Sequence, residues 1–229
     1  MKAYKGFKPD LTWDGFQFEI GKTYEVEGKP IYYKNGFTAC GDIDSVFIEC
    51  GLRNDNIICE VEVLGDIDRD GDSSRVVTNK IKIIRELTVD DLLKFNTTRT
   101  LIKAIILDPS IITEDMLRHD DWGVRVTIAE LGKNRHRNVL VNDTHFKVRV
   151  AVATYGTTKH RDILINDSNV YVRCYVARYG TNKHRNILLD DEHWMVRKYV
   201  AKYGTNKQRD ILHDDKDCDV VEATRKYYK

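Results

Sequence analysis

The sequence lacks the features that mark membrane-spanning, exported or zinc-binding proteins. No apolar run in its 229 residues approaches the roughly 20 residues that a membrane-spanning helix needs. Residues 1–10 contain no apolar signal core, so we do not expect export. The five cysteines include no CxxC pair, which argues against a disulfide or zinc framework. We therefore expect a cytoplasmic protein with reduced thiols and no membrane partner.

Charge is distributed unequally along the chain. The composition, with 41% hydrophobic and 32% charged residues, is typical of a globular protein, and its formal net charge is +1. Residues 1–117 contain 15 Lys+Arg and 21 Asp+Glu, a net charge of −6, whereas residues 118–229 contain 22 and 15, a net charge of +7. All seven histidines also lie in the second half. This asymmetry predicts two units with different surfaces.

The second half is an internal repeat. The dipeptide Val-Arg recurs every 24 residues, at Val124-Arg125, Val148-Arg149, Val172-Arg173 and Val196-Arg197. Columns of alanine, glycine, leucine and aspartate keep the same spacing without an insertion. Such a period predicts stacked units that bury one continuous core.

Each unit reads as a helix, a glycine turn, a short helix and a second turn. Apolar residues at i, i+4 and i+7 place one face of the first helix in the core. Gly180 is expected to stop this helix in the left-handed conformation. Thr181 is expected to cap the short helix, which turns Ile187 and Leu188 inward.

The pattern Asp-x5-Val-Arg-x2-Val-Ala-x-Tyr-Gly-Thr-x5-Ile-Leu-x2-Asp, which ends at Asp215, resembles the leucine-rich repeat variant family. It is similar, more loosely, to HEAT-like repeats. The resemblance implies 24-residue units that alternate an α-helix with a short 3₁₀ helix in a right-handed superhelix. It implies a fold and no activity.

Two columns of the repeat are charged. The arginine of each Val-Arg dipeptide follows a turn aspartate by six residues. Because a guanidinium group suits carboxylates and carbonyls, we expect arginine–aspartate pairs that brace adjacent units.

The second charged column lies at the start of each short helix and is predicted to bind the partner. This basic row comprises Arg135, His136, Arg137, Lys159, His160, Arg161, Lys183, His184, Arg185, Lys207 and Arg209. Helix N-termini add partial positive charge, so the row suits an acidic protein face or a phosphate backbone. An ordinary solvated face inherited by duplication is the alternative. Units stacked about 10 Å apart hold the histidines too far apart to share a metal, so no metal site is predicted.

The first part of the chain predicts strands. Short alternating or aromatic segments occur at 3–7, 16–20, 23–26, 31–33, 57–64 and 80–87. Asn35-Gly36 indicates a tight turn, and Asp42 is a candidate cap for a short helix over 42–50. Thr88 and Asp91 resemble a capping box that opens a helical connection.

The fold class is therefore α+β, an N-terminal antiparallel-sheet domain followed by an all-α solenoid of 24-residue two-helix repeats. The head domain spans 1–87, and a helical connection with a degenerate capping repeat spans 88–120. The solenoid spans 121–229, with four full repeats and a partial fifth.

The head resembles an uncharacterised domain of phage and bacterial proteins that is often fused to repeats. The resemblance lies in Tyr4-Lys-Gly-Phe7, Gly36-Phe-Thr-Ala-Cys40 and Val63-Leu-Gly-Asp66. Thr38 stands where that family usually has histidine.

The default interpretation of the head is an inert cap or a partner-binding domain, and two chemical alternatives remain open beside it. Asp66 to Asp72 matches the start of a calcium loop, although Val77 stands where a bidentate Glu is needed, and an acidic hairpin turn is the other interpretation. The order of sheet motifs is also loosely similar to that of ADP-ribosyltransferases, which use NAD. Glu86 is then the one plausible catalytic acid.

No nucleophile–base pair, phosphate-binding glycine loop or ligand cluster stands out, so we expect no enzyme and no cofactor. We expect a non-enzymatic protein whose solenoid surface engages a macromolecule, a protein first and a nucleic acid second. The resemblance of the head implies a phage protein that blocks a host factor. An ADP-ribosyltransferase-like head targeted by the solenoid is the alternative.

Overall fold

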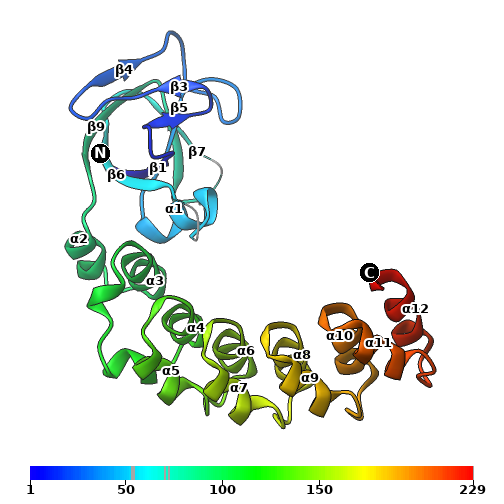
Figure 1. Ribbon diagram of the computed structural model, residues 1–229. Coiled ribbons are helices and arrows are strands. Elements are labelled where there is room, and N and C mark those ends of the chain that lie inside the picture. The colour runs from blue at the N-terminus through cyan, green and yellow to red at the C-terminus, as the bar shows by residue number, and fades with distance from the viewer. Residues whose placement is uncertain (53–54, 70, 72, 229) are drawn as a thin grey trace. The chain divides into compact units, whose positions relative to one another are not determined.

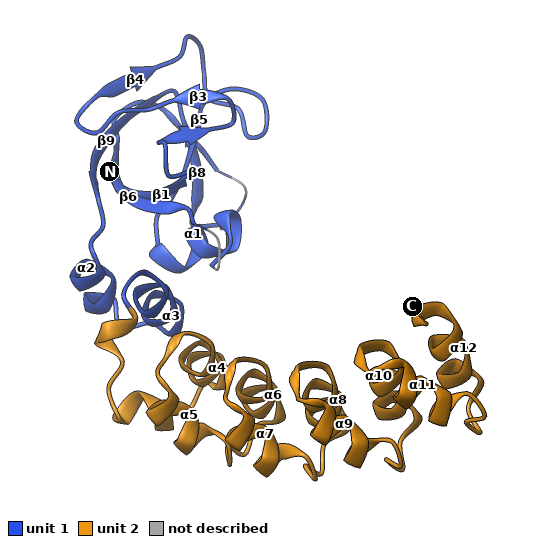
Figure 2. Ribbon diagram, viewed as in Figure 1, with its two compact units in different colours: residues 1–108 blue, residues 109–229 orange. Residues whose placement is uncertain are grey.

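A computed structural model describes residues 1–52, 55–69, 71 and 73–228 of the chain. It contains two compact units, Met1–Asp108 and Pro109–Lys229 (Figure 2). The first unit holds an antiparallel sheet and the second holds helical repeats, so the α+β fold class is confirmed. Among the described helices, none has the length and apolar character needed to cross a bilayer.

In the described part of the first unit, seven strands form one antiparallel sheet in the order β4-β9-β6-β1-β5-β8-β7 (Figure 1). The strands are β1 Lys2–Phe7, β4 Thr23–Glu25, β5 Phe37–Cys40, β6 Ile57–Val63, β7 Ile67–Arg69, β8 Arg75–Thr78 and β9 Lys80–Glu86. A separate hairpin pairs β2 Thr12–Trp13 with β3 Phe16–Gln17. The central strand β1 pairs with β6 along its whole length and meets β5 at Tyr4 and Cys40.

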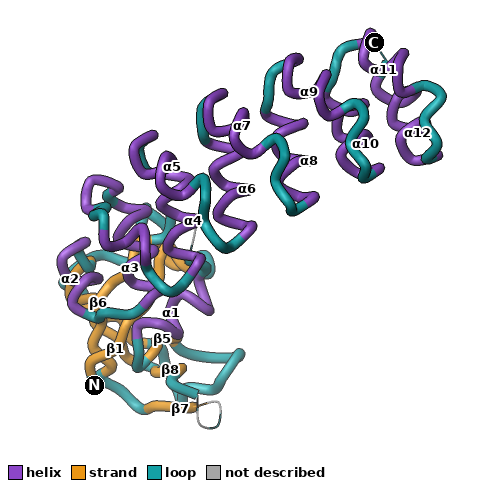
Figure 3. Tube along the Cα trace, turned by 90° about the horizontal axis from the view of Figure 1, so that it is seen from below, coloured by secondary structure: helices purple, strands orange, loops and turns teal. Residues whose placement is uncertain are grey.

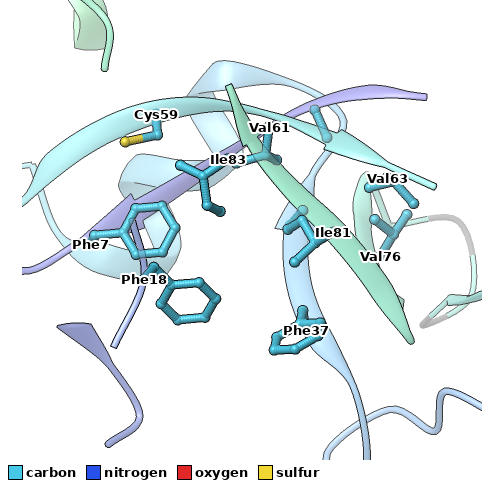
Figure 4. Close-up of a cluster of buried hydrophobic side chains, with 11 residues drawn as sticks. Phe7, Phe18, Phe37, Cys59, Val61, Val63, Val76, Ile81 and Ile83 are labelled. Carbon is cyan, nitrogen blue, oxygen red and sulfur yellow. The ribbon is translucent and has the colours of Figure 1, made fainter. Parts of the chain in front are cut away.

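Aromatic and β-branched side chains fill the core of this unit. Phe7, Phe18 and Phe37 lie beside Ile81 and Ile83 from β9 (Figure 4).

Helix α1, Ile43–Cys50, is capped by the Asp42 carboxylate, which accepts a hydrogen bond from the Ser45 amide at 2.8 Å. An added Cβ at Gly6 would overlap the Cys50 side chain, so glycine allows α1 to lie close to β1. All five cysteines are free thiols.

Most of the strands expected from alternation are present, but the segment 31–33 is not a strand. Ile31 and Asn35 form an isolated bridge around a turn in which Tyr33 has a positive φ of 61°. Strands β2, β5, β7 and β8 were not predicted. β5 and β8 are buried almost continuously, and they therefore lack the alternation that marks a strand with one exposed face.

The second unit stacks helices in two rows (Figure 3). The long helices are α4 Trp122–Leu131, α6 Phe146–Tyr155, α8 Val170–Tyr179, α10 Trp194–Tyr203 and α12 Cys218–Tyr227. The short helices are α5 Asn134–Leu140, α7 Thr158–Leu164, α9 Asn182–Leu188 and α11 Asn206–Leu212. Long helices contact the next long helix, and short helices pack against them.

Two further helices precede these repeats in the chain. Helix α2, Val89–Lys94, begins with the expected capping box of Thr88 and Asp91. Helix α3, Thr98–Leu107, keeps the repeat register, since it begins 24 residues before α4. Two 3₁₀ turns, Pro109–Ile111 and Asp115–Arg118, follow it where later units have a short α-helix. Both helices belong to the first compact unit, which also contains the sheet.

The expected arginine–aspartate pairs are present in every full repeat. Nε and Nη2 of Arg173 donate to Asp191 at 2.7 and 3.0 Å, and Nη1 donates to the Asp167 carbonyl oxygen at 2.8 Å. The equivalent pairs are Arg125–Asp143, Arg149–Asp167 and Arg197–Asp215. Each aspartate side chain is 6% exposed, so these pairs are well shielded from water. One arginine therefore fixes the turns at both ends of its repeat.

The repeat glycines act differently from the expectation. Gly180 has φ −74° and ψ 177°, an extended conformation, so the prediction of a left-handed cap was wrong. An added Cβ there would overlap the Val176 carbonyl oxygen and would lie in tight contact, 3.0 Å, with the His184 side chain. Glycine is thus needed because a Cβ would collide with the end of its own helix and crowd the short helix that follows.

Arg173→Ala is expected to lower the free energy of unfolding by about 3 kcal/mol, because it leaves the Asp191 carboxylate nearly buried without its partner. Urea unfolding followed by circular dichroism measures the change. Lys183→Ala, at an exposed position of the same repeat, is the control and should cost less than about 0.5 kcal/mol. Similar losses for both variants would contradict this role of the pair.

Candidate partner-binding site

The structure divides the predicted basic row into buried and exposed members. His136, His160 and His184 are 3%, 3% and 1% exposed, so they are inside the solenoid. Nδ1 of His160 accepts a hydrogen bond from the Thr157 amide at 2.9 Å, as the third residue of a capping box. This leaves the ring proton on Nε2, which lies 2.9 Å from Oδ1 of Asn138 in the preceding repeat. All three histidines thus cap their own helix, and His160 and His184 also link it to the preceding repeat.

The arginine that follows the histidine or glutamine in each repeat of the basic row is also bound within the solenoid. Nε of Arg161 donates to the Ala153 carbonyl oxygen at 2.7 Å, and Nη2 donates to that of Thr154 at 2.9 Å. Arg137, Arg185 and Arg209 make the equivalent bonds. These side chains satisfy carbonyl groups at the C-terminal end of each long helix, where helices lack internal donors.

One exposed basic side chain per repeat therefore remains of the basic row. We call the line of these four side chains along the short helices the short-helix row. These residues are Arg135, Lys159, Lys183 and Lys207. Beside them lies an exposed apolar column, in which Ile187 is 53% exposed. The prediction that Ile187 turns inward was wrong, whereas Leu188 is 3% exposed and belongs to the core.

The long helices carry a second, more aromatic surface. Two of its tyrosines, Tyr171 and Tyr179, are 49% and 38% exposed. We call it the tyrosine–cation face, and it comprises Tyr171, Tyr175, Tyr179, Tyr199, Tyr203, Tyr227, Arg178, Lys198, Lys202 and Lys226. Its helices, α8, α10 and α12, lie side by side along the inner curve of this unit (Figure 2).

Cations and rings alternate across this face from one repeat to the next. The Arg178 guanidinium lies 4.9 Å from the Tyr179 ring centre and 5.4 Å from that of Tyr203 on the next long helix. The Lys202 ammonium lies 5.2 Å from Tyr203 and 5.6 Å from Tyr227. Such contacts hold cations over ring faces with little desolvation. The result is a preorganised row of positive charge with aromatic contact area between the charges.

A cavity of about 180 Å³ lies between α10 and α12 on the same face. Its lining includes Tyr199, Lys202 and Tyr227, together with the carboxylates of Asp219 and Glu222. The Lys198 ammonium pairs with Asp219 at 3.2 Å. The cavity thus offers aromatic walls and hydrogen-bonding groups of both signs.

A simple sequence signal could have found this face. The last two residues of successive long helices read Arg178-Tyr179, Lys202-Tyr203 and, at the C-terminal end, Lys226-Tyr227. A cation–tyrosine pair that recurs every 24 residues is as regular as the basic row. The earlier repeats end in Glu130-Leu131 and Thr154-Tyr155, so the cationic signal begins with α8.

In the head, the motifs Tyr4-Lys-Gly-Phe7 and Gly36-Phe-Thr-Ala-Cys40 meet on the adjacent strands β1 and β5. Nζ of Lys5, on β1, donates to Oγ1 of Thr38, on β5, at 2.8 Å. Thr38, which stands where histidine is usual in the resembling family, is thus the hydrogen-bond partner of a buried lysine. Glu86, the expected acid of an ADP-ribosyltransferase-like site, is exposed at the end of β9 opposite Cys59.

The candidate calcium loop lies partly outside the described residues, which do not include Asp70 and Asp72. Asp68 accepts a hydrogen bond from the Tyr32 amide at 2.9 Å. Within residues 1–52, 55–69, 71 and 73–228, no group of three His, Cys, Asp or Glu side chains is placed to hold a metal ion.

The histidine links predict a pH-dependent stability of the solenoid. Burial, followed by the charges of nearby arginines, lowers the pKa of His136 and of His160 below the usual 6.5. The unfolded chain therefore binds more protons, and the stability that is fully present above pH 6.5 should be lost as pH falls from 6.5 through the lowered pKa values of the folded state. Gln208 occupies the same column and makes the same bonds without titrating, to the Thr205 amide at 2.9 Å and to Asn186 at 2.7 Å.

The double variant His136→Gln/His160→Gln should fold and lose part of the decrease in melting temperature between pH 7.5 and 5.5. The exposed His213→Gln is the control and should keep the decrease of the wild type. Thermal unfolding by circular dichroism at several pH values measures this. An unchanged pH dependence in the double variant would show that these histidines do not couple protons to folding.

Comparisons with known proteins agree with the two-part architecture. Residues 1–95 match the model of a family described as a domain of unknown function, DUF7666. A solved leucine-rich repeat variant, described as having a novel repetitive protein structural motif, aligns with a TM-score of 0.54 and 20% identity. That alignment covers 62% of this chain and 60% of the solved one, and it shows a shared fold. No curated protein matches the chain. The repeat part thus folds like a leucine-rich repeat variant, as the sequence indicated, but its short helices α5, α7, α9 and α11 are α-helices and not the 3₁₀ helices that the resemblance implied.

Proposed function

We propose that this protein is a binding or scaffold protein that holds an acidic segment of a partner protein on its tyrosine–cation face. The observation that carries the proposal is the alternation of Arg178, Lys202 and Lys226 with Tyr179, Tyr203 and Tyr227 across successive long helices. Tyrosine and arginine supply much of the binding energy in protein interfaces, since both combine large contact area with hydrogen bonding. Acidic side chains of the partner would pair with the cations, and its apolar groups would pack against the rings.

The charge pattern favours a protein over a nucleic acid. Asp219 and Glu222 lie among the lysines between α10 and α12, where they would repel a continuous phosphate backbone. A polypeptide can place a donor opposite those two carboxylates and an acidic residue opposite each lysine. On the short-helix row, Asp162 and Asp210 likewise interrupt the positive charge.

The resemblance of the head implies a phage protein that blocks a host factor, and the tyrosine–cation face supports that role. Covering an acidic segment of a host factor would block that segment by occlusion, with no chemistry at the site. Three successive long helices present the groups that such a segment needs, so the expected footprint spans α8, α10 and α12.

A charge-matched pair of variants separates the two basic surfaces. Arg178→Ala/Lys202→Ala/Lys226→Ala removes three cations from the tyrosine–cation face, and Lys159→Ala/Lys183→Ala/Lys207→Ala removes three from the short-helix row. Biolayer interferometry with a biotinylated glutamate–tyrosine copolymer measures retention of the full chain. We expect the first variant to bind at least about tenfold more weakly than the wild type, and the second to change by less than about threefold.

Far-ultraviolet circular dichroism confirms that both variants keep their helices. A larger loss in the short-helix variant would assign binding to the other surface. Tighter binding of a single-stranded oligonucleotide than of the copolymer, with a steep decrease as salt rises, would make the partner a nucleic acid and overturn the proposal.

A further inference from the structure

The head contains a buried cation beside an aromatic cavity. Lys5 is 4% exposed, and its ammonium group lies 5.0 Å from the Trp13 ring centre and 5.7 Å from that of Phe7. Its one hydrogen-bond partner among the described residues is the neutral Thr38 hydroxyl. No described carboxylate lies within the 4.0 Å of an ion pair with it. Burying an ammonium group without an anion is costly, so a lysine in this position calls for an external anionic partner.

The cavity next to Lys5 has the composition of a small-molecule site. It has a volume of about 220 Å³, and its lining includes Lys5, Trp13, Phe16, Phe37 and Thr38. Ligand pockets typically combine apolar and aromatic walls with a few polar groups that fix the orientation of the ligand. Figure 4 shows the Phe37 and Phe18 rings of this cavity among the buried side chains of the sheet.

The other charges near the cavity are already engaged or lie at its rim. Glu49, in an adjoining cavity of about 250 Å³, accepts a hydrogen bond from the Cys40 thiol at 3.4 Å and lies 3.9 Å from the Arg75 guanidinium. Asp14 is exposed in the turn between β2 and β3 and lines both cavities. Its charge disfavours an anion at the rim, which would direct the anionic end of a ligand inward to Lys5.

We propose that the cavity beside Lys5 binds a small organic carboxylate with a planar ring, its carboxylate on the Lys5 ammonium and its ring among the aromatic side chains. Thr38 holds the ammonium group in place. Burial lowers the pKa of Lys5 to about 8, although Glu49 and other groups act in the opposite direction, as expected for a cation that lacks a close anion. The proposal concerns the head alone and is independent of the tyrosine–cation face.

Isothermal titration calorimetry of the full chain with 1-naphthoate tests the proposal. We expect a dissociation constant below about 1 mM for the wild type, and at least about tenfold weaker binding of the neutral analogue 1-naphthamide. Lys5→Met keeps the length of the side chain, removes the charge, and should weaken naphthoate binding to the level of the amide. The variant Arg178→Ala/Lys202→Ala/Lys226→Ala should bind naphthoate like the wild type, which separates this site from the solenoid.

Absence of naphthoate binding by the wild type would overturn the proposal, as would equal binding of naphthoate and naphthamide. Unchanged affinity in a folded Lys5→Met variant would also overturn it. If that variant does not fold, the comparison of the acid with the amide on the wild type decides the question.

Discussion

The repeats depend on one interaction, the bidentate hydrogen bonding of a shielded arginine to the carboxylate of a turn aspartate. Because the guanidinium group of Arg173 also binds the carbonyl oxygen of Asp167, a single side chain fixes the turns at both ends of its unit. The carboxylate of Asp191 in turn accepts a hydrogen bond from the His193 amide at 2.9 Å, which shapes the turn into the next unit. Each turn is thus held from both sides, and the helices stack at a constant register.

This frame determines which polar side chains remain for a partner. The histidines of the short helices, and the arginine that follows each of them, are bound to backbone groups or to the neighbouring repeat, so they build the solenoid. On the last three long helices, Arg178, Lys202 and Lys226 instead lie over tyrosine rings. The positive charge of the second half therefore has two origins, one structural and one available at the surface. That separation is the physical basis for assigning binding to the tyrosine–cation face.

Much of the architecture could be predicted from the sequence, because the repeat period averages out local ambiguity. The arginine–aspartate pairs followed from the charge and spacing of two columns. What could not be predicted was the orientation of groups in each short helix: His160 and Arg161 read as a basic row, but one caps its own helix and the other satisfies carbonyls of the preceding helix. In the head, β5 and β8 were missed because they are nearly continuously buried, and the cavity beside Lys5 requires a strand pairing that no local pattern reveals.

The proposed partner contact lies on the inner row of long helices. Lysine acylation footprinting of the full chain, with and without the bound glutamate–tyrosine copolymer and read by mass spectrometry, locates this contact on the surface. We expect the copolymer to protect Lys202 and Lys226 from acylation and to leave Lys159, Lys183 and Lys207 as reactive as in the free protein. Protection of the three short-helix lysines, with Lys202 and Lys226 unchanged, would contradict it.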